Sequence, residues 1–118
     1  MKILLLLVLI LPMTLAQASS REDQRLMLKK WGLAYCLRTY QQQDPENEAS
    51  IAMGGYFQLG GHYENAYENV RGFFKRKIPE DTKVIKESGK ANNLMRCLNA
   101  YESSAYSKLV LEQDDWLH

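Results

Sequence analysis

Apolar residues are concentrated at the N-terminal end of the chain. Lys2 is followed by nine consecutive apolar residues, Ile3 to Leu11, and a short segment then ends in Ala16-Gln17-Ala18. A positive charge, a short apolar core and an Ala-x-Ala site are the parts of a cleaved secretory signal peptide. The core is too short for a transmembrane anchor, because about 20 apolar residues are needed to cross a bilayer. We therefore expect residues 1–18 to be a signal peptide and residues 19–118 to form a single mature domain.

Beyond this segment, the apolar positions recur with the 3.6-residue period that is typical of amphipathic helices. The first predicted helix covers about 22–43 and stops before Pro45. Pro45 suits the first turn of a second helix, with Asp44 as its N-cap. Gly60-Gly61 is expected to end that second helix through a left-handed residue.

Two glycines, Gly54 and Gly55, lie in the middle of the second predicted helix. Each costs up to about 1 kcal/mol relative to alanine in a helix interior. Glycine also permits another backbone to approach closely. We therefore expect another helix to pack against this position.

A third predicted helix covers about 62–77 and is closed by Pro79, since helices usually end near a proline. Residues 79–90 have no helical period and are mostly polar or charged. They are expected to form a long exposed loop.

A fourth helix is expected to resume around Ala91, and Ser103 or Ser104 is expected to cap a last short helix that includes Trp116. No segment has the pattern of a strand. The predicted fold is therefore all-α, a compact bundle of four to five helices with short connections.

Length and charge restrict the classes of function. Removing the predicted signal peptide leaves 100 of the 118 residues, the size of one domain. It also removes Lys2, so 14 of the 15 Lys and Arg residues remain against 14 Asp and Glu. Such a neutral chain lacks the basic excess of nucleic-acid-binding domains. We expect no nucleic-acid partner and, after signal cleavage, no stable membrane association.

The two cysteines, Cys36 and Cys97, predict one disulfide, because an even pair in an exported protein is normally oxidised. Closing a loop of about 60 residues stabilises a domain by about 4 kcal/mol. The bridge would join the first and fourth helices and bring their Cα atoms within about 7 Å. The sequence has no CxxC or CxxCH motif, which disfavours redox and haem roles.

Few residues have the chemistry of a catalytic or metal site. His62 and the C-terminal His118, which we expect to be frayed, have no evident nucleophile to activate. Glu64 and Glu68 lie one turn apart and could join His62 around a metal, but a solvated helix face has the same pattern. We therefore predict no catalytic residues, metal or cofactor, and a protein that binds rather than catalyses.

Four segments carry a more specific pattern. They are Trp31-Gly32-Leu33-Ala34-Tyr35-Cys36-Leu37, Ala49-Ser50 with Met53-Gly54-Gly55-Tyr56, Ala66-Tyr67-Glu68 with Val70-Arg71, and Asn93-Leu94-Met95-Arg96-Cys97-Leu98-Asn99-Ala100-Tyr101. Together they resemble the periplasmic immunity proteins that neutralise the fourth family of type VI secretion amidase effectors. The two segments centred on the cysteines are the most specific.

The resemblance implies a non-enzymatic, all-helical, homodimeric antitoxin of the periplasm. Its implied partner is a papain-like Cys-His amidase that cuts peptidoglycan stems between D-glutamate and meso-diaminopimelate. Inhibition in this family is by occlusion: a protruding loop enters the substrate cleft and a helix of the partner subunit contacts the toxin nearby.

The loop at 79–90 and the third predicted helix correspond to these two parts of the family's inhibitory surface. The toxin-binding residues expected from the resemblance are Glu80, Asp81, Lys83, Lys86, Glu87 and Ser88 in the loop, and Glu64, Glu68, Arg71 and Lys75 in the helix.

An alternative from another class is a periplasmic helical-bundle carrier of a small ligand or metal. The sequence supports it through its many aromatic residues and through His62.

Overall fold

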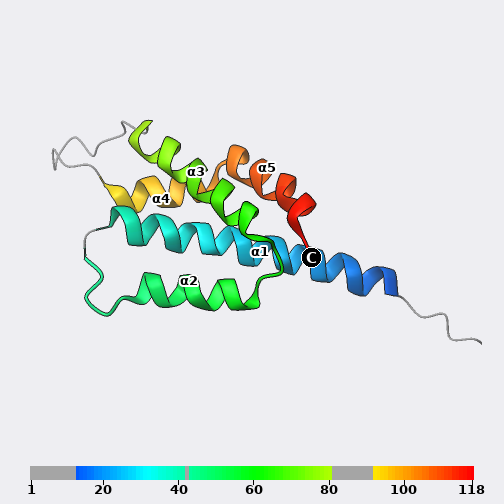
Figure 1. Ribbon diagram of the computed structural model, residues 1–118. Coiled ribbons are helices and arrows are strands. Elements are labelled where there is room, and N and C mark those ends of the chain that lie inside the picture. The colour runs from blue at the N-terminus through cyan, green and yellow to red at the C-terminus, as the bar shows by residue number, and fades with distance from the viewer. Residues whose placement is uncertain (1–12, 42, 81–91) are drawn as a thin grey trace, which may run out of the picture.

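The computed structural model describes residues 13–41, 43–80 and 92–118, with side chains from Ser20 onward. The described chain is all-α, and α2 lies along one side of the long helix α1 while α4 and α5 lie on the other (Figure 1). No helix in these residues is long and apolar enough to span a membrane. The elements are α1 (Met13–Tyr40), α2 (Glu48–Leu59), α3 (Glu64–Glu80), α4 (Asn93–Glu102), α5 (Ser104–Glu112) and the 3-10 helix η1 (Gln113–Trp116).

The predicted fold class is confirmed, but several helix boundaries differ from the prediction. Helix α1 begins at Met13, nine residues before its predicted start at 22. This start does not test cleavage before Ser19, so the signal peptide and the division at residue 18 stay predictions.

Helix α2 begins at Glu48 instead of at Pro45, because the chain makes a turn first. Asn47, the residue before the helix, has a left-handed backbone with φ of 53°. The Asp44 carboxylate accepts hydrogen bonds from the backbone N–H groups of Glu48 at 2.8 Å and Ala49 at 3.1 Å. Asp44, the first residue of this turn, therefore satisfies two free N–H donors at the start of α2, as an N-cap would, although Asn47 occupies the N-cap position.

Helix α3 includes Pro79 and ends at Glu80, so the expectation that Pro79 closes the helix is wrong by one residue. A proline in the last turn removes only one hydrogen bond near the helix end, which the preceding turns tolerate. The predicted loop thus loses residues 79 and 80 to α3, and residues 81–90 lie outside the described chain.

The last helices begin at side-chain caps. Asn92 accepts a hydrogen bond from the Met95 N–H at 3.0 Å at the start of α4, and Ser103 accepts one from the Tyr106 N–H at 3.2 Å at the start of α5. Of the two predicted serine caps, Ser103 is the right one. The predicted last helix is divided, because Trp116 belongs to η1.

The core is centred where α3 and α5 cross α1. Tyr106 is fully buried, and its hydroxyl donates a hydrogen bond of 2.8 Å to the Lys29 carbonyl oxygen on α1. Burial raises the pKa of Tyr106 well above 10, so the donor proton is retained. A Cβ at Gly32 would lie less than 3.0 Å from side-chain atoms of Tyr106, Val70 and Phe74. Only glycine therefore fits α1 at this crossing.

The predicted disulfide is confirmed. Cys36 on α1 and Cys97 on α4 are bonded, with their Cα atoms 5.8 Å apart and both side chains fully buried. The bond fixes α4 beside α1, and the Asn93 side chain adds a hydrogen bond of 2.8 Å to the Tyr40 carbonyl oxygen.

Gly60 ends α2 as predicted, but the expected left-handed residue at this end and the expected helix against Gly54 and Gly55 are wrong. Gly54 and Gly55 are exposed, and a Cβ built on either meets nothing within 4 Å in the described chain. Gly60 ends α2 with φ of −83°, an extended rather than a left-handed backbone. Glycine is required at position 60 for another reason, because a Cβ there would collide with the Tyr67 hydroxyl.

The crossing at Gly32 gives a stability prediction. We expect Gly32→Ala to lower the free energy of unfolding by about 1–3 kcal/mol, because the added methyl group overpacks the core. Denaturant unfolding followed by circular dichroism measures this. The matched control is Gly72→Ala on α3, where an added Cβ meets only the flexible Arg76 guanidinium at 3.3 Å. Equal stability of the two variants would contradict the proposed crossing.

Candidate functional site

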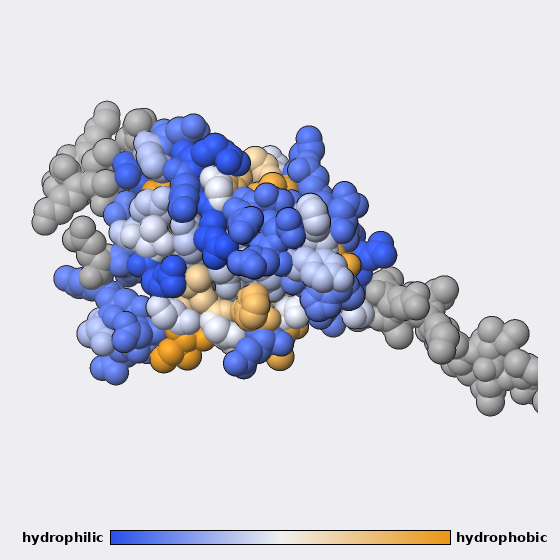
Figure 2. Space-filling view, viewed as in Figure 1, coloured by the Kyte–Doolittle hydropathy of each residue, from blue (hydrophilic) through white to orange (hydrophobic). Residues whose placement is uncertain are grey.

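Helix α3 has a buried apolar side and an exposed charged side. Its buried residues are Ala66, Tyr67, Val70, Phe74 and Ile78. Glu64, Glu68, Arg71 and Lys75 follow one another at spacings of four, three and four residues, which places them in one line along the helix. We refer to these four residues as the α3 stripe. The stripe is acidic in its first half and basic in its second, and Figure 2 shows a mostly hydrophilic surface over α3.

Arg71 is the least exposed member of the stripe. Its guanidinium lies 5.5 Å from the centre of the Trp31 ring. Trp31 is itself 4% exposed and packs edge-on against Tyr67, with ring centroids 4.9 Å apart. This cation–π contact restricts the side chain of Arg71, so the centre of the stripe presents a cation in a defined position.

The structure brings together only part of the predicted site. Glu64, Glu68 and Lys75 are exposed beside Arg71. Glu80 is also exposed, but 16 residues at 100° each rotate it about 160° around the helix axis from Glu64, so it lies off the stripe. The remaining predicted loop residues, Asp81, Lys83, Lys86, Glu87 and Ser88, lie outside the described residues.

Two exposed basic residues of α3 are absent from the predicted site. Arg76 and Lys77 follow Lys75, so three consecutive cations occupy the second half of the helix. Their exposure follows from the same period that places Phe74 and Ile78 in the core. The helical pattern therefore contained the signal for them.

The start of α3 is held by the C-terminal end of the chain. The backbone of His62 and Leu117 forms an antiparallel bridge, flanked by hydrogen bonds from Tyr63 N–H to the Trp116 carbonyl at 2.7 Å and from His118 N–H to the Gly61 carbonyl at 3.0 Å. The ring of His118 also packs on Tyr63. The expectation that His118 is frayed is therefore wrong.

An ion pair connects this end to α1. The Arg25 guanidinium donates two hydrogen bonds to the Asp114 carboxylate, one of them at 3.0 Å from Nε. The bidentate pair lowers the pKa of Asp114 and raises the pKa of Arg25. Because both side chains are partly exposed, the pair contributes modestly to stability and mainly orients η1.

We refer to the backbone bridge and this ion pair together as the C-terminal clamp. His62 is part of it and is 5% exposed, and neither of its ring nitrogens has a hydrogen-bond partner in the described structure. Burial lowers the pKa of His62 below 6.5, against the weaker opposing effect of Asp114. Glu64 and Glu68 are solvent-exposed, whereas His62 is enclosed. Among the described residues, no three His, Cys, Asp or Glu side chains are grouped as a metal site.

The enclosed His62 predicts pH-dependent stability. As pH falls below 6.5, the unfolded chain takes up the proton before the folded protein does, so stability decreases until the lower folded pKa is passed. His62→Phe should flatten this decrease between pH 7 and pH 5, measured by thermal unfolding. The Arg25–Asp114 pair does not interfere, because the pKa of Asp114 lies below 3.8. If stability decreases equally with pH in both proteins, His62 is not the group responsible for the decrease.

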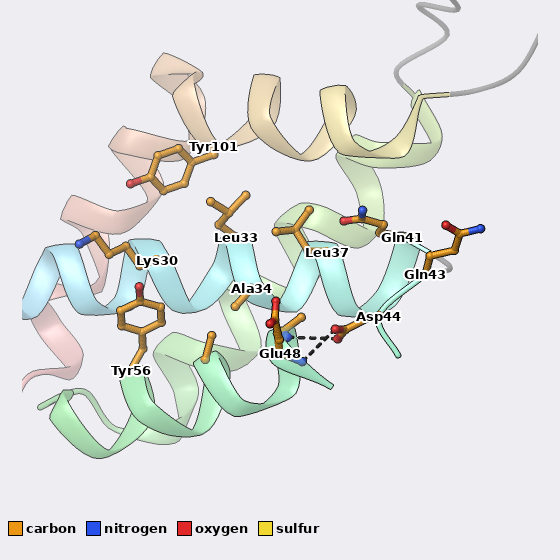
Figure 3. Close-up of a pocket in the computed structure, with 12 residues that line it drawn as sticks. Lys30, Leu33, Ala34, Leu37, Gln41, Gln43, Asp44, Glu48, Tyr56 and Tyr101 are labelled. Atoms are coloured by element: carbon orange, nitrogen blue, oxygen red, sulfur yellow. Dashed lines mark hydrogen bonds between the residues drawn. The ribbon is translucent and has the colours of Figure 1, made fainter. Parts of the chain in front are cut away.

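A second candidate site is a groove of about 470 Å³ (Figure 3). In Figure 3, Leu33 and Leu37 of α1 lie between Tyr56 of α2 and Tyr101 of α4. Lys30 is at one end of the groove and Asp44 and Glu48 are at the other. The small-ligand carrier alternative would depend on this groove, whose lining is partly apolar and partly charged. Its lining residues are Lys30, Leu33, Ala34, Leu37, Gln41, Gln43, Asp44, Glu48, Ala49, Ala52, Tyr56 and Tyr101.

Comparison with protein families decides between the alternatives. The family described as Tai4, type VI secretion system (T6SS) amidase immunity protein, matches residues 26–110, which span both cysteines and the α3 stripe. The chain belongs to the Tai4 family. The resemblance inferred from the sequence is thereby confirmed. Comparisons with curated proteins and with solved structures gave no match.

Membership in the Tai4 family establishes the general function. The protein is an immunity protein against a T6SS amidase effector, and immunity proteins of this family are not enzymes. Amidase immunity proteins act in the periplasm, and the Cys36–Cys97 disulfide is consistent with that oxidising compartment. The predictions of a non-enzymatic function and of an amidase partner are confirmed at this level.

Proposed function

We propose that this Tai4 protein inhibits its cognate amidase by occluding the catalytic cleft, and so protects the producing cell and its kin from lysis. The amidase is the papain-like Cys-His enzyme that the resemblance implies. The proposed contact surface consists of residues 80–88 of one subunit and the α3 stripe of the other subunit of the proposed homodimer. Family membership over residues 26–110 is the observation that carries this proposal.

The rigidity of α3 supports occlusion as the mechanism. Its apolar side is buried in the core, its first residues are held by the C-terminal clamp, and Arg71 rests on Trp31. A surface that is ordered before binding loses little conformational entropy when it docks. Inhibition by occlusion needs only such a surface, because no chemical step is required of the inhibitor.

The charge pattern of the α3 stripe supports a specific partner. Glu64 and Glu68 present negative charge, whereas Arg71 and Lys75 present positive charge about two turns further along the helix. A partner with the reverse order of charges is favoured, and one with the same order is repelled. The stripe therefore selects among amidases by charge order more than by net charge.

Export and assembly complete the proposal. We infer that residues 1–18 are a signal peptide, cleaved before Ser19, which delivers the protein to the compartment where the amidase acts. We also infer that the mature protein forms a homodimer, as the family resemblance implies.

The stripe predicts the effect of charge reversal. Glu64→Lys with Glu68→Lys should weaken binding to the purified cognate amidase about tenfold or more, because two favourable contacts become repulsive. Calorimetry and inhibition of peptidoglycan cleavage measure the loss. The matched control reverses two exposed charges on α5, Lys108→Glu with Glu112→Lys, and should bind normally. If the unaltered protein neither binds nor inhibits the amidase, the proposed function is wrong.

The contribution of residues 80–88, which begin at the last residue of α3, is tested separately. Replacing residues 80–88 by a Gly/Ser linker should change thermal stability little and weaken amidase binding about a hundredfold, or about 2.7 kcal/mol. Periplasmic co-expression with the amidase reports the same effect as lost protection from lysis. Unchanged affinity would move the site away from this segment.

A further inference from the structure

The groove of Figure 3, which we call the α1 groove, carries opposite charges at its two ends. Lys30 is at one end, and Asp44 and Glu48 are at the other. Among the described residues, none of these three side chains forms an ion pair. The Asp44 carboxylate accepts two hydrogen bonds from backbone N–H groups, which do not neutralise its charge. The described chain thus leaves a positive and a negative end of the groove without a charged partner.

Between these ends, the lining of the α1 groove is largely apolar. Leu33 and Leu37 of α1 form its floor, and Tyr56 of α2 and Tyr101 of α4 lie on its two sides (Figure 3). All four side chains are only partly buried, although they pack against the core. Each of them therefore keeps apolar surface that an occupant of the groove can cover.

The α4 side of the groove offers further apolar surface. Leu94 and Leu98 precede Tyr101 by seven and three residues, so they lie on the same side of α4 as Tyr101. Leu94 is 43% exposed and Leu98 is 41% exposed. Asn93 at the start of α4 bonds the Tyr40 carbonyl oxygen, so these leucines lie towards the negative end of the groove. An occupant that reaches this end can contact them.

The length of the groove restricts the size of its occupant. Lys30 and Gln41, which lies near Asp44 in Figure 3, are separated by about 16 Å along α1 at 1.5 Å per residue. An extended peptide of five residues has the same length of about 16 Å. The groove volume of about 470 Å³ is also within the usual range for sites that bind small molecules.

The charges at the two ends indicate which chemical class fits. A fatty acid would place its carboxylate beside Lys30, but its hydrocarbon end would then desolvate the carboxylates of Asp44 and Glu48. A peptide with free ends instead supplies an anion at one end and a cation at the other. The side-chain amides of Gln41 and Gln43 in the lining can also donate and accept hydrogen bonds with a peptide backbone.

We propose that the α1 groove binds a short apolar peptide with free ends, with its C-terminal carboxylate beside Lys30 and its amino terminus beside Asp44 and Glu48. Capture of peptide termini by fixed groups is an established mode of recognition. This binding function is additional to amidase immunity and does not depend on it. The described lining of the groove contains no residue of α3, so the groove and the α3 stripe are separate surfaces.

Calorimetric titration of the exported, disulfide-bonded protein with the synthetic peptide Ala-Leu-Ala-Leu-Ala tests the proposal. Saturable binding of one peptide per chain is expected. Acetylation of the amino terminus and amidation of the carboxyl terminus should each weaken binding about fivefold, because each removes one pair of exposed charges. Added salt should weaken binding of the free peptide more than that of the doubly blocked peptide. The dipeptide Ala-Leu is too short to reach both ends and should bind much more weakly.

Variants of the protein assign each end of the peptide. Lys30→Gln should weaken binding of the free peptide about fivefold but leave binding of the amidated peptide unchanged, because that pair is already lost. Glu48→Gln should weaken the free peptide more than the acetylated one for the same reason. The matched control is Lys108→Gln on α5, which removes an exposed charge outside the groove and should bind normally. Ala52→Trp should fill the groove and abolish binding, with folding checked by circular dichroism.

Several results would overturn the proposal. One is the absence of saturable binding of the free pentapeptide. Another is equal binding of the free and doubly blocked peptides, which would mean that the charged ends recognise nothing. Binding that survives all three groove variants would lie elsewhere on the protein. If Ala52→Trp abolishes self-association and the unaltered protein binds no peptide, a second copy occupies the groove. None of these results would bear on amidase inhibition, which is measured separately.

Discussion

The crossing of α1 by α3 and α5 at Gly32 is the constraint on which the rest of the structure depends. Tyr106 fits against α1 only because position 32 has no side chain, and its hydroxyl then bonds the Lys29 carbonyl. Val70 and Phe74 also pack against Gly32 because it has no side chain, and this contact fixes how closely α3 approaches α1. This close approach of the two helices brings Arg71 over the Trp31 ring. The orientation of the charged surface of α3 is thus a consequence of one glycine on a different helix.

Local patterns in the sequence located the helices but could not distinguish the roles of their glycines. The apolar period identified all five α-helices of the described chain, because burial of one side is a property of each segment alone. Gly32 and Gly55 both occupy helix interiors, yet one lies against three side chains and the other faces open space. The difference depends on residues 38–74 positions further along the chain. Asp44 is a second example of a role that the local sequence predicts only in part. Its capping of α2 was predictable, but the turn between Asp44 and the helix was not.

Part of the candidate site could likewise be predicted from the sequence, and part depends on tertiary structure. The line from Glu64 to Lys75 follows from helical spacing and needed no tertiary information. The contact of Arg71 with Trp31 depends on how α1 and α3 cross, and the position of Glu80 away from the stripe depends on Pro79 remaining inside α3. The clamp around His62 joins residues more than 50 positions apart through backbone bonds, which leave no residue pattern to detect. Family membership supplies the partner, which none of this geometry identifies.

The exposed and the buried residues of α3 have different proposed roles, toxin recognition and packing of the core. The α3 stripe is charged, and in the proposed complex its order of charges would discriminate between partners. In the proposed complex, a change of charge on the stripe would alter which amidase is bound without changing the core residues Tyr67, Val70 and Phe74, which lie on a neighbouring side of the same helix. Under this proposal, the exposed charges of α3 can change with the toxin while the buried residues of the same helix, and with them the scaffold, stay the same.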